Sequence, residues 1–142
     1  MPSSAAVFVD TSGWIALLNT DDQLHAAARE HLSEFAASSR VLVTTDWVLA
    51  ETGNGLARTA ARKRFVRAVR RFLESSSSRF VRIDSPTFRA ALDLYAQATD
   101  KTWGLIDCAS FVVMRSMKVT DALTADRHFE QGGFRCLLAG RI

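Results

Sequence analysis

The chain has little cysteine and no long apolar run. Its 142 residues include two cysteines, Cys108 and Cys136, which do not form a pair at the spacing of a zinc site. We expect each to be a small buried hydrophobe. No stretch approaches the roughly 20 apolar residues of a membrane span, and the N-terminus lacks the basic segment of a secretory signal. These absences predict a cytoplasmic protein without membrane segments.

The length and composition are those of one folded domain. A chain of 142 residues can bury a core without disulfides or metal staples. Its hydrophobic content of 48% and charged content of 23% are ordinary for a globular protein. No long linker divides the sequence, so we expect a single domain over residues 1–142.

Apolar runs alternate with stretches of helical period along the chain. The expected strands cover residues 7–9, 41–43, 80–83, 122–125 and a short stretch near 134–138. Helices are predicted between them. One begins with Ser85 as its N-cap and turns Phe88, Leu92 and Tyr95 inward. Strands that alternate with helices predict an α/β fold, in which a mostly parallel sheet of about five strands is flanked by helices.

Four carboxylates occupy similar places in this pattern. Asp10 and Asp126 each follow an apolar run, and Glu51 and Asp107 lie early in helical stretches. Ligands of such sheets bind outside the carboxyl ends of the strands, where the following helices also begin. Acids there are costly to bury without a partner, and their repetition predicts one shared divalent cation. We prefer Asp126 to Asp121, which is expected to precede the strand and to belong to the turn.

A site of this kind suits phosphodiester hydrolysis. Three or four carboxylates hold Mg²⁺ or Mn²⁺, which prefer oxygen ligands. The cation would lower the pKa of a bound water and neutralise charge on a phosphoryl group. Without the cation, the acids would repel one another and some of their pKa values would rise. Ser12 and Thr124, each two residues from an acid, could orient a carboxylate or a metal-bound water.

Positive charge is concentrated in one stretch of a chain whose net charge is +3. No acid occurs between Thr52 and Leu73, where the basic residues are Arg58, Arg62, Lys63, Arg64, Arg67, Arg70 and Arg71. Apolar residues recur there with helical period, so the basic side chains should mainly face solvent. One interpretation is a solvated helix face. The other is a contact for phosphate backbone or an acidic partner, and the acid cluster favours it.

Other polar and aromatic side chains are weaker candidates. His128 could approach the cleft, but we expect a structural or surface role for it. Asp100 is expected to be a loop or capping acid. Trp103, in the loop before Asp107, is left open between base stacking and packing.

The segments around the four acids resemble the motifs of the PIN-domain family. Residues 9–14 (VDTSGW) are similar to the opening of a PIN domain, and residues 51–52 (ET) to its second acidic position. Residues 105–111 (LIDCASF) and 123–129 (LTADRHF) are similar to the third and fourth positions. The likeness covers almost the whole chain in order. Ala125 departs from it, since a bulkier residue is usual there, and we expect this to alter packing more than chemistry.

The resemblance implies a PIN fold, which is a three-layer sandwich, and a Mg²⁺- or Mn²⁺-dependent endoribonuclease. Compact members of this kind are commonly VapC-like toxins of toxin–antitoxin pairs, with tRNA or rRNA as the expected substrate. A cognate antitoxin whose Arg or Lys enters the cleft, and a homodimer, are further expectations. The roles carried over make four residues the catalytic, metal-coordinating acids and two their assistants: Asp10, Glu51, Asp107 and Asp126, with Ser12 and Thr124.

Three alternatives accompany this interpretation. A phosphatase or receiver domain also uses an aspartate at a strand end, but a haloacid-dehalogenase-like phosphatase has a second aspartate where Ser12 stands. A non-catalytic RNA-binding module would bind RNA without metal and cleave none, and the presence of all four acids argues against it. A PIN nuclease of RNA processing, outside any toxin–antitoxin system, would share the same chemistry.

Overall fold

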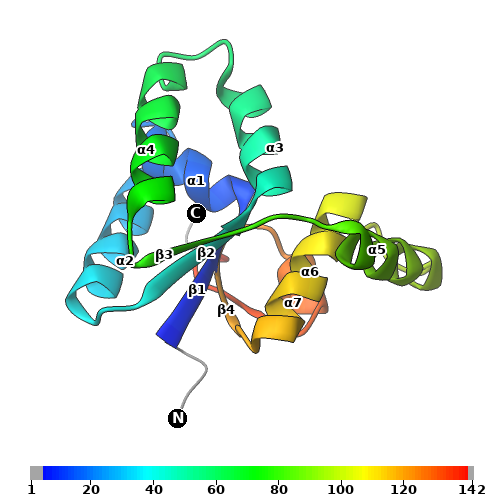
Figure 1. The fold of residues 1–142 in the computed structure, drawn as a ribbon. Coiled ribbons are helices and arrows are strands. Elements are labelled where there is room, and N and C mark those ends of the chain that lie inside the picture. The colour runs from blue at the N-terminus through cyan, green and yellow to red at the C-terminus, as the bar shows by residue number, and fades with distance from the viewer. Residues whose placement is uncertain (1–4, 141–142) are drawn as a thin grey trace.

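A computed structural model describes residues 5–140 of the chain (Figure 1). Within these residues, one sheet contains the strands β1 (Ala6–Val9), β2 (Val41–Thr45), β3 (Ser78–Val81), β4 (Asp121–Leu123) and β5 (Arg135–Cys136). The strand order is β3-β2-β1-β4-β5, and every neighbouring pair is parallel. The predicted α/β fold with a parallel sheet is confirmed.

The helices of residues 5–140 are α1 (Thr11–Leu18), α2 (His25–Ala37), α3 (Asp46–Leu56), α4 (Arg62–Glu74), α5 (Ser85–Gln97), α6 (Leu105–Met117) and α7 (His128–Gln131). In Figure 1, α1, α2 and α4 lie on one side of the sheet, and α5, α6 and α7 lie on the other. The helix α3 follows β2 and packs against α1 and α4. This is the three-layer arrangement that the family resemblance implied. Over the same residues, no helix combines the length and the apolarity that a bilayer span requires.

The core is centred on β1, the middle strand. Val7, Phe8 and Val9 are all fully buried, because helices cover both faces of the sheet and leave neither face for polar residues. The ring of Phe8 packs against that of Phe129, with centroids 6.3 Å apart. Burial of each such side chain stabilises the fold by about 1.5–3 kcal/mol. The carboxyl end of β1 is therefore held rigidly in place.

Gly13 allows α1 to lie directly on the end of β4. A Cβ atom at this position would stand 2.1 Å from the carbonyl oxygen of Leu123, which is far inside van der Waals contact. The same carbonyl accepts a hydrogen bond from the backbone N–H of Asp10 at 3.3 Å. The end of β1, the first turn of α1 and the end of β4 are thereby brought together.

The boundaries of β4 differ from those predicted. This strand begins at Asp121, so the assignment of Asp121 to the preceding turn is wrong. Its carboxylate is buried between Arg40 and Arg135, each of which donates hydrogen bonds to it at 3.0–3.1 Å, and these contacts offset the cost of burying the charge. The strand ends at Leu123. We had expected Asp126 to follow the strand directly. It lies instead in the loop after β4.

The helix α5 exposes the face that was expected to be buried. Phe88, Leu92 and Tyr95 are 39%, 46% and 50% exposed, whereas Ala91 is fully buried. The reason is that α5 packs mainly against α6, outside the layer that contacts the sheet. The prediction of Ser85 as the N-cap is wrong by one residue, because the cap is Asp84, whose side chain accepts a hydrogen bond from the backbone N–H of Thr87. The apolar face of α5 is consequently open to solvent in the single chain.

Candidate active site

Asp10 is the most deeply buried acid at the carboxyl edge of the sheet. It directly follows β1, is 5% exposed, and its Oδ2 accepts a hydrogen bond from Thr124 Oγ1 at 3.0 Å. Burial raises the pKa of Asp10 from the ordinary value of 3.8 to about 7. The negative charges of Asp107 and Asp126 add to this rise, and hydrogen bonds from Thr11 and Thr124 oppose it. A negative charge at this position lacks a compensating cation among the described residues.

Asp107 and Asp126 come from two different elements. Asp107 lies in the first turn of α6, where its Oδ2 accepts a hydrogen bond from the backbone N–H of Gly104 at 3.0 Å. Asp126 lies in the loop after β4, and its backbone N–H donates to Thr124 Oγ1 at 3.0 Å. Burial raises the pKa of Asp107, and the charge of Asp126 contributes to the rise. The two carboxylates are therefore close enough to repel each other.

His128 lies between these two carboxylates. Its Nδ1 is 3.2 Å from both Asp107 Oδ2 and Asp126 Oδ1, and its Nε2 is 3.0 Å from Thr102 Oγ1. One possible ligand atom from each of Asp107, Asp126 and His128 lies within 4.8 Å of the others. The sequence pattern indicated only a structural or surface role for His128. Its position two residues after Asp126 is the signal that could have included it in the cluster.

Two hydroxyl groups connect the acids to the backbone. Thr124 Oγ1 donates its single proton to Asp10, so in its 3.0 Å contact with Ser12 Oγ the serine must be the donor. Ser12 Oγ also accepts a hydrogen bond from the backbone N–H of Ala125 at 2.9 Å. The hydroxyls of Ser12 and Thr124 thus lie where they can orient the carboxylate of Asp10.

Glu51 lies at the edge of the acid cluster. Thr45 caps α3 by accepting a hydrogen bond from the backbone N–H of Val48 at 3.1 Å. Glu51 follows in the second turn and is exposed. Its Oε1 accepts a hydrogen bond from the hydroxyl of Thr11, the residue after Asp10. Of the four predicted acids, the structure brings Asp10 into electrostatic contact with Asp107 and Asp126 and leaves Glu51 linked through Thr11.

The donor set fits a hard divalent cation. Asp107, Asp126 and His128 offer ligand atoms within 4.8 Å of one another, and Asp10, just after β1, is near enough to feel the charges of both aspartates. Carboxylate oxygens are preferred ligands of Mg²⁺ and Mn²⁺. Burial is the main cause of the raised pKa values of Asp10 and Asp107, and the negative charges of neighbouring carboxylates add to both rises. A cation would relieve this crowding, so these residues could hold one.

Trp103 and Asp100 lie near the site in sequence but have other contacts. The ring of Trp103 packs edge-on against Phe111, with centroids 4.9 Å apart, and its Nε1 donates to Gln131 Oε1 at 2.9 Å. These contacts assign Trp103 to packing. Asp100 is exposed and pairs with Lys101 at 2.7 Å, as expected for a loop acid.

Comparison with known proteins identifies the family. A family model described as the PIN domain matches residues 7–134. The chain therefore belongs to the PIN-domain family. It is 30% identical over 128 residues to the 23S rRNA-specific endonuclease VapC20 of Mycobacterium tuberculosis, a match that covers 90% of this chain and 95% of that protein.

Solved structures agree with this assignment. The crystal structure of Mycobacterium tuberculosis VapC20, described as a sarcin-ricin loop cleaving toxin, matches with a TM-score of 0.79 and 29% identity over 90% of this chain and 95% of that chain. FitAcB from Neisseria gonorrhoeae has the same fold, with a TM-score of 0.65 and 16% identity over 92% of this chain and 95% of that chain. The predicted family and fold are confirmed.

Proposed function

We propose that this protein is a metal-dependent endoribonuclease and the toxin of a VapC-type toxin–antitoxin pair. The observation that carries the proposal is the convergence of Asp10, Asp107 and Asp126 at the carboxyl edge of a PIN-domain sheet, where burial and neighbouring charge raise the pKa of Asp10 to about 7. The similarity to VapC20, a 23S rRNA-specific endonuclease, supports RNA as the substrate and an rRNA loop as the first substrate to test.

The three clustered acids would hold Mg²⁺ or Mn²⁺, with Glu51 at the edge. When bound, such a cation supplies charge neutralisation at the phosphodiester and an activated water. The chain supplies the orientation. Thr124 holds Asp10, and the backbone N–H of Gly104 holds Asp107. The hydroxyls of Ser12 and Thr124 already hydrogen-bond within the site, so we assign the attack on phosphorus to water.

The exposed basic face of α4 supports a contact with the RNA backbone. Phe72 is buried and both Phe65 and Val69 are half-buried, so the apolar stripe of α4 faces the core. Arg64 donates its Nε to the carbonyl of Leu18 at 2.8 Å. The remaining basic residues of this stretch are exposed: Arg58, Arg62, Lys63, Arg67, Arg70 and Arg71. Uncompensated positive charge of this kind attracts a polyanion.

Substitution of Asp10 or Asp107 by Asn tests the activity. The wild-type protein should cleave an RNA that carries an rRNA loop in Mg²⁺ or Mn²⁺, and EDTA should stop the reaction. Each variant should lose about 100-fold or more in rate. Asp100→Asn removes an exposed acid outside the cluster and is the matched control. Unchanged cleavage by the folded Asp10→Asn protein would contradict the mechanism, and an acyl-phosphate trapped on Asp10 would favour a phosphatase.

We further propose an antitoxin protein as a partner. An Arg or Lys of the antitoxin would pair with the acid cluster in place of the cation. A groove of about 510 Å³ between α1, α2 and α4 supports a second contact, since it has apolar walls that include Trp14 and Phe72 and is bordered by Arg29 and Arg71. These features fit an amphipathic helix with acidic flanks.

The binding of an antitoxin, such as the product of the gene immediately upstream, tests the contact with the acid cluster. The double variant Asp10→Ala/Asp126→Ala should bind it less tightly than the wild type does. Equal affinity would exclude insertion of a basic side chain into the cleft. A homodimer is also proposed, and the exposed apolar face of α5 supports it.

A further inference from the structure

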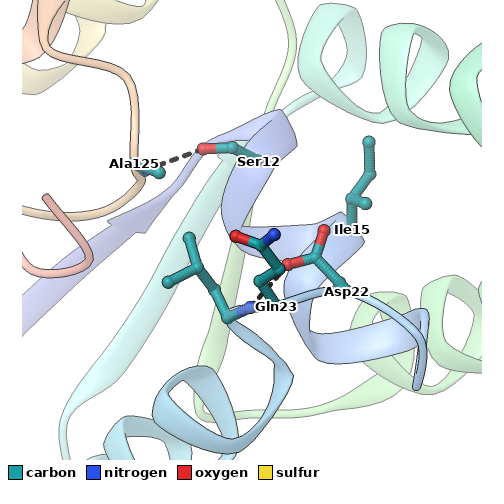
Figure 2. Close-up of a pocket in the computed structure, with 6 residues that line it drawn as sticks. Ser12, Ile15, Asp22, Gln23 and Ala125 are labelled. Carbon is teal, nitrogen blue, oxygen red and sulfur yellow. Dashed lines mark hydrogen bonds between the residues drawn. The ribbon is translucent and has the colours of Figure 1, made fainter. Parts of the chain in front are cut away.

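A second cavity lies beside the acid cluster. Its volume is about 330 Å³, and it is lined by Ser12, Ile15, Asp22, Gln23, Leu24 and Ala125 (Figure 2). Ser12 belongs to both places. Its Oγ accepts a hydrogen bond from the backbone N–H of Ala125, as Figure 2 shows, and contacts the Thr124 hydroxyl that holds Asp10. A molecule in this cavity would therefore lie next to the candidate reaction centre.

The small side chain at residue 125 keeps this cavity open. Alanine at this position was expected to alter packing more than chemistry. In the structure Ala125 lines the cavity with a single methyl group, so a longer side chain would take up part of the volume.

The cavity combines an apolar wall with two polar side chains. Ile15, Leu24 and Ala125 offer apolar surface, and Asp22 and Gln23 offer hydrogen-bonding groups. Figure 2 shows the side chains of Asp22 and Gln23 extending from the segment before α2 toward α1. Asp22 Oδ1 accepts a hydrogen bond from the backbone N–H of Leu24 at 2.8 Å, which orients the carboxylate. Within residues 5–140, no hydrogen-bond donor pairs with its Oδ2.

We infer that this cavity is a base-binding subsite in which Asp22 selects guanine. The inference rests on the proposed function, because it places the base next to the phosphodiester that is cleaved. An ionised carboxylate only accepts hydrogen bonds, and it can accept two in parallel. Guanine is the RNA base whose Watson–Crick edge presents two adjacent donors, N1–H and the N2 amino group.

The other three bases match Asp22 less well. Adenine and cytosine place an acceptor beside their amino donor, and uracil has one donor between two acceptors, so each would direct a lone pair at the carboxylate. The carboxamide of Gln23 can donate a hydrogen bond to O6 of guanine. The apolar wall can pack against the face of the base. Single-stranded RNA loops present bases unstacked and available for this kind of recognition.

Five-nucleotide RNAs that differ only in their central base test the subsite by fluorescence anisotropy, with Ca²⁺ in place of Mg²⁺. The wild type should bind the guanine RNA about tenfold or more tightly than the other three. Asp22→Asn retains an acceptor for the N–H of Leu24 and replaces the other oxygen with a donor. It should lose the guanine preference and favour adenine or cytosine. Asp21→Asn removes a neighbouring exposed charge outside the cavity and should keep the preference.

Two further variants probe the cavity without altering the turn at Asp22. Ala125→Leu should weaken binding of the guanine RNA about tenfold by filling the cavity, and Gln23→Ala should reduce the guanine preference severalfold. Equal binding of all four RNAs by the wild type would overturn the inference. A guanine preference that Asp22→Asn leaves unchanged would also overturn it.

Cleavage of the same RNAs in Mg²⁺ or Mn²⁺ separates the inference from the proposed function. Cleavage with no guanine preference that depends on Asp22 would refute the subsite and leave the nuclease assignment standing. Guanine binding that depends on Asp22, together with no cleavage of the RNA that carries an rRNA loop in either metal, would support the subsite and refute the nuclease assignment.

Discussion

Replacing Asp10 by Asn should stabilise the metal-free protein at alkaline pH while it removes cleavage. The pKa of Asp10 is about 7 in the folded protein, against an ordinary value of 3.8. Between these values the folded protein retains the proton and the unfolded chain releases it. The unfolded state therefore binds fewer protons in this window, so the stability of the wild type falls as pH rises from about 4 to about 7.

The size of this effect follows from the two pKa values. A difference of one pKa unit corresponds to about 1.36 kcal/mol, so the step from 3.8 to about 7 corresponds to about 4 kcal/mol. About 2.5 kcal/mol of this is lost between pH 5 and pH 8. Asparagine does not titrate, and its carbonyl oxygen can still accept the hydrogen bond from Thr124. The advantage of the variant should therefore grow by about 2.5 kcal/mol over this range.

Urea unfolding of both proteins in EDTA at pH 5 and pH 8 measures the difference. Asp100→Asn is the control. The pKa of Asp100 is lowered by its hydrogen bond from Lys101, below this window, so its difference from the wild type should stay constant. Mg²⁺ at about 100 times its Kd should add about 2.7 kcal/mol to the wild type and less to Asp10→Asn. If the free energies of unfolding of the wild type and Asp10→Asn changed in parallel with pH, the raised pKa assigned to Asp10 would be refuted.

Three further substitutions give separate predictions. Gly13→Ala forces a Cβ against the carbonyl of Leu123 and should lower the free energy of unfolding by about 3 kcal/mol; an unchanged urea midpoint would show that α1 can move away from β4. Asp121→Asn removes the negative charge that Arg40 and Arg135 share and should cost about 3 kcal/mol, with metal-dependent cleavage retained in the folded fraction. Leu92→Glu should convert a homodimer into monomers in light scattering, whereas Leu73→Glu, at a similarly exposed site on α4, should not.

The part of the fold that the sequence predicts well is the part governed by strong periodicity. The strand before Asp10 is an uninterrupted apolar run because β1 is covered on both faces, and the helical stretch predicted to carry Asp107 near its start is α6. The prediction that this face of α5 is buried was wrong, because helical period shows which residues share a face but not whether another element covers that face. Phe88 and Leu92 form such a face and remain exposed.

The site was predictable only as far as topology determines it. Parallel strands end at one edge, so the neighbourhood of Asp10 and Asp107 follows from the order of the elements. The distance of Glu51 from the other three acids depends on the direction in which α3 leaves β2, and no sequence pattern encodes that direction. The place of His128 depends on the loop after β4, where Asp126 Oδ1 accepts a hydrogen bond from the His128 backbone N–H at 2.9 Å. The positions of Glu51 and His128 therefore depend on loop geometry, which the secondary-structure propensities of the residues predict poorly.

One close approach determines both the acid cluster and the adjacent cavity. Gly13 lets the first turn of α1 contact the end of β4, and this contact brings Ser12 within hydrogen-bonding distance of Thr124 and Ala125. Thr124 then orients Asp10 on one side, and Ala125 lines the cavity on the other. A residue larger than glycine at position 13 would separate α1 from β4 and disturb both places together. The glycine in the motif of residues 9–14 therefore serves the geometry of the site, although it carries no functional group itself.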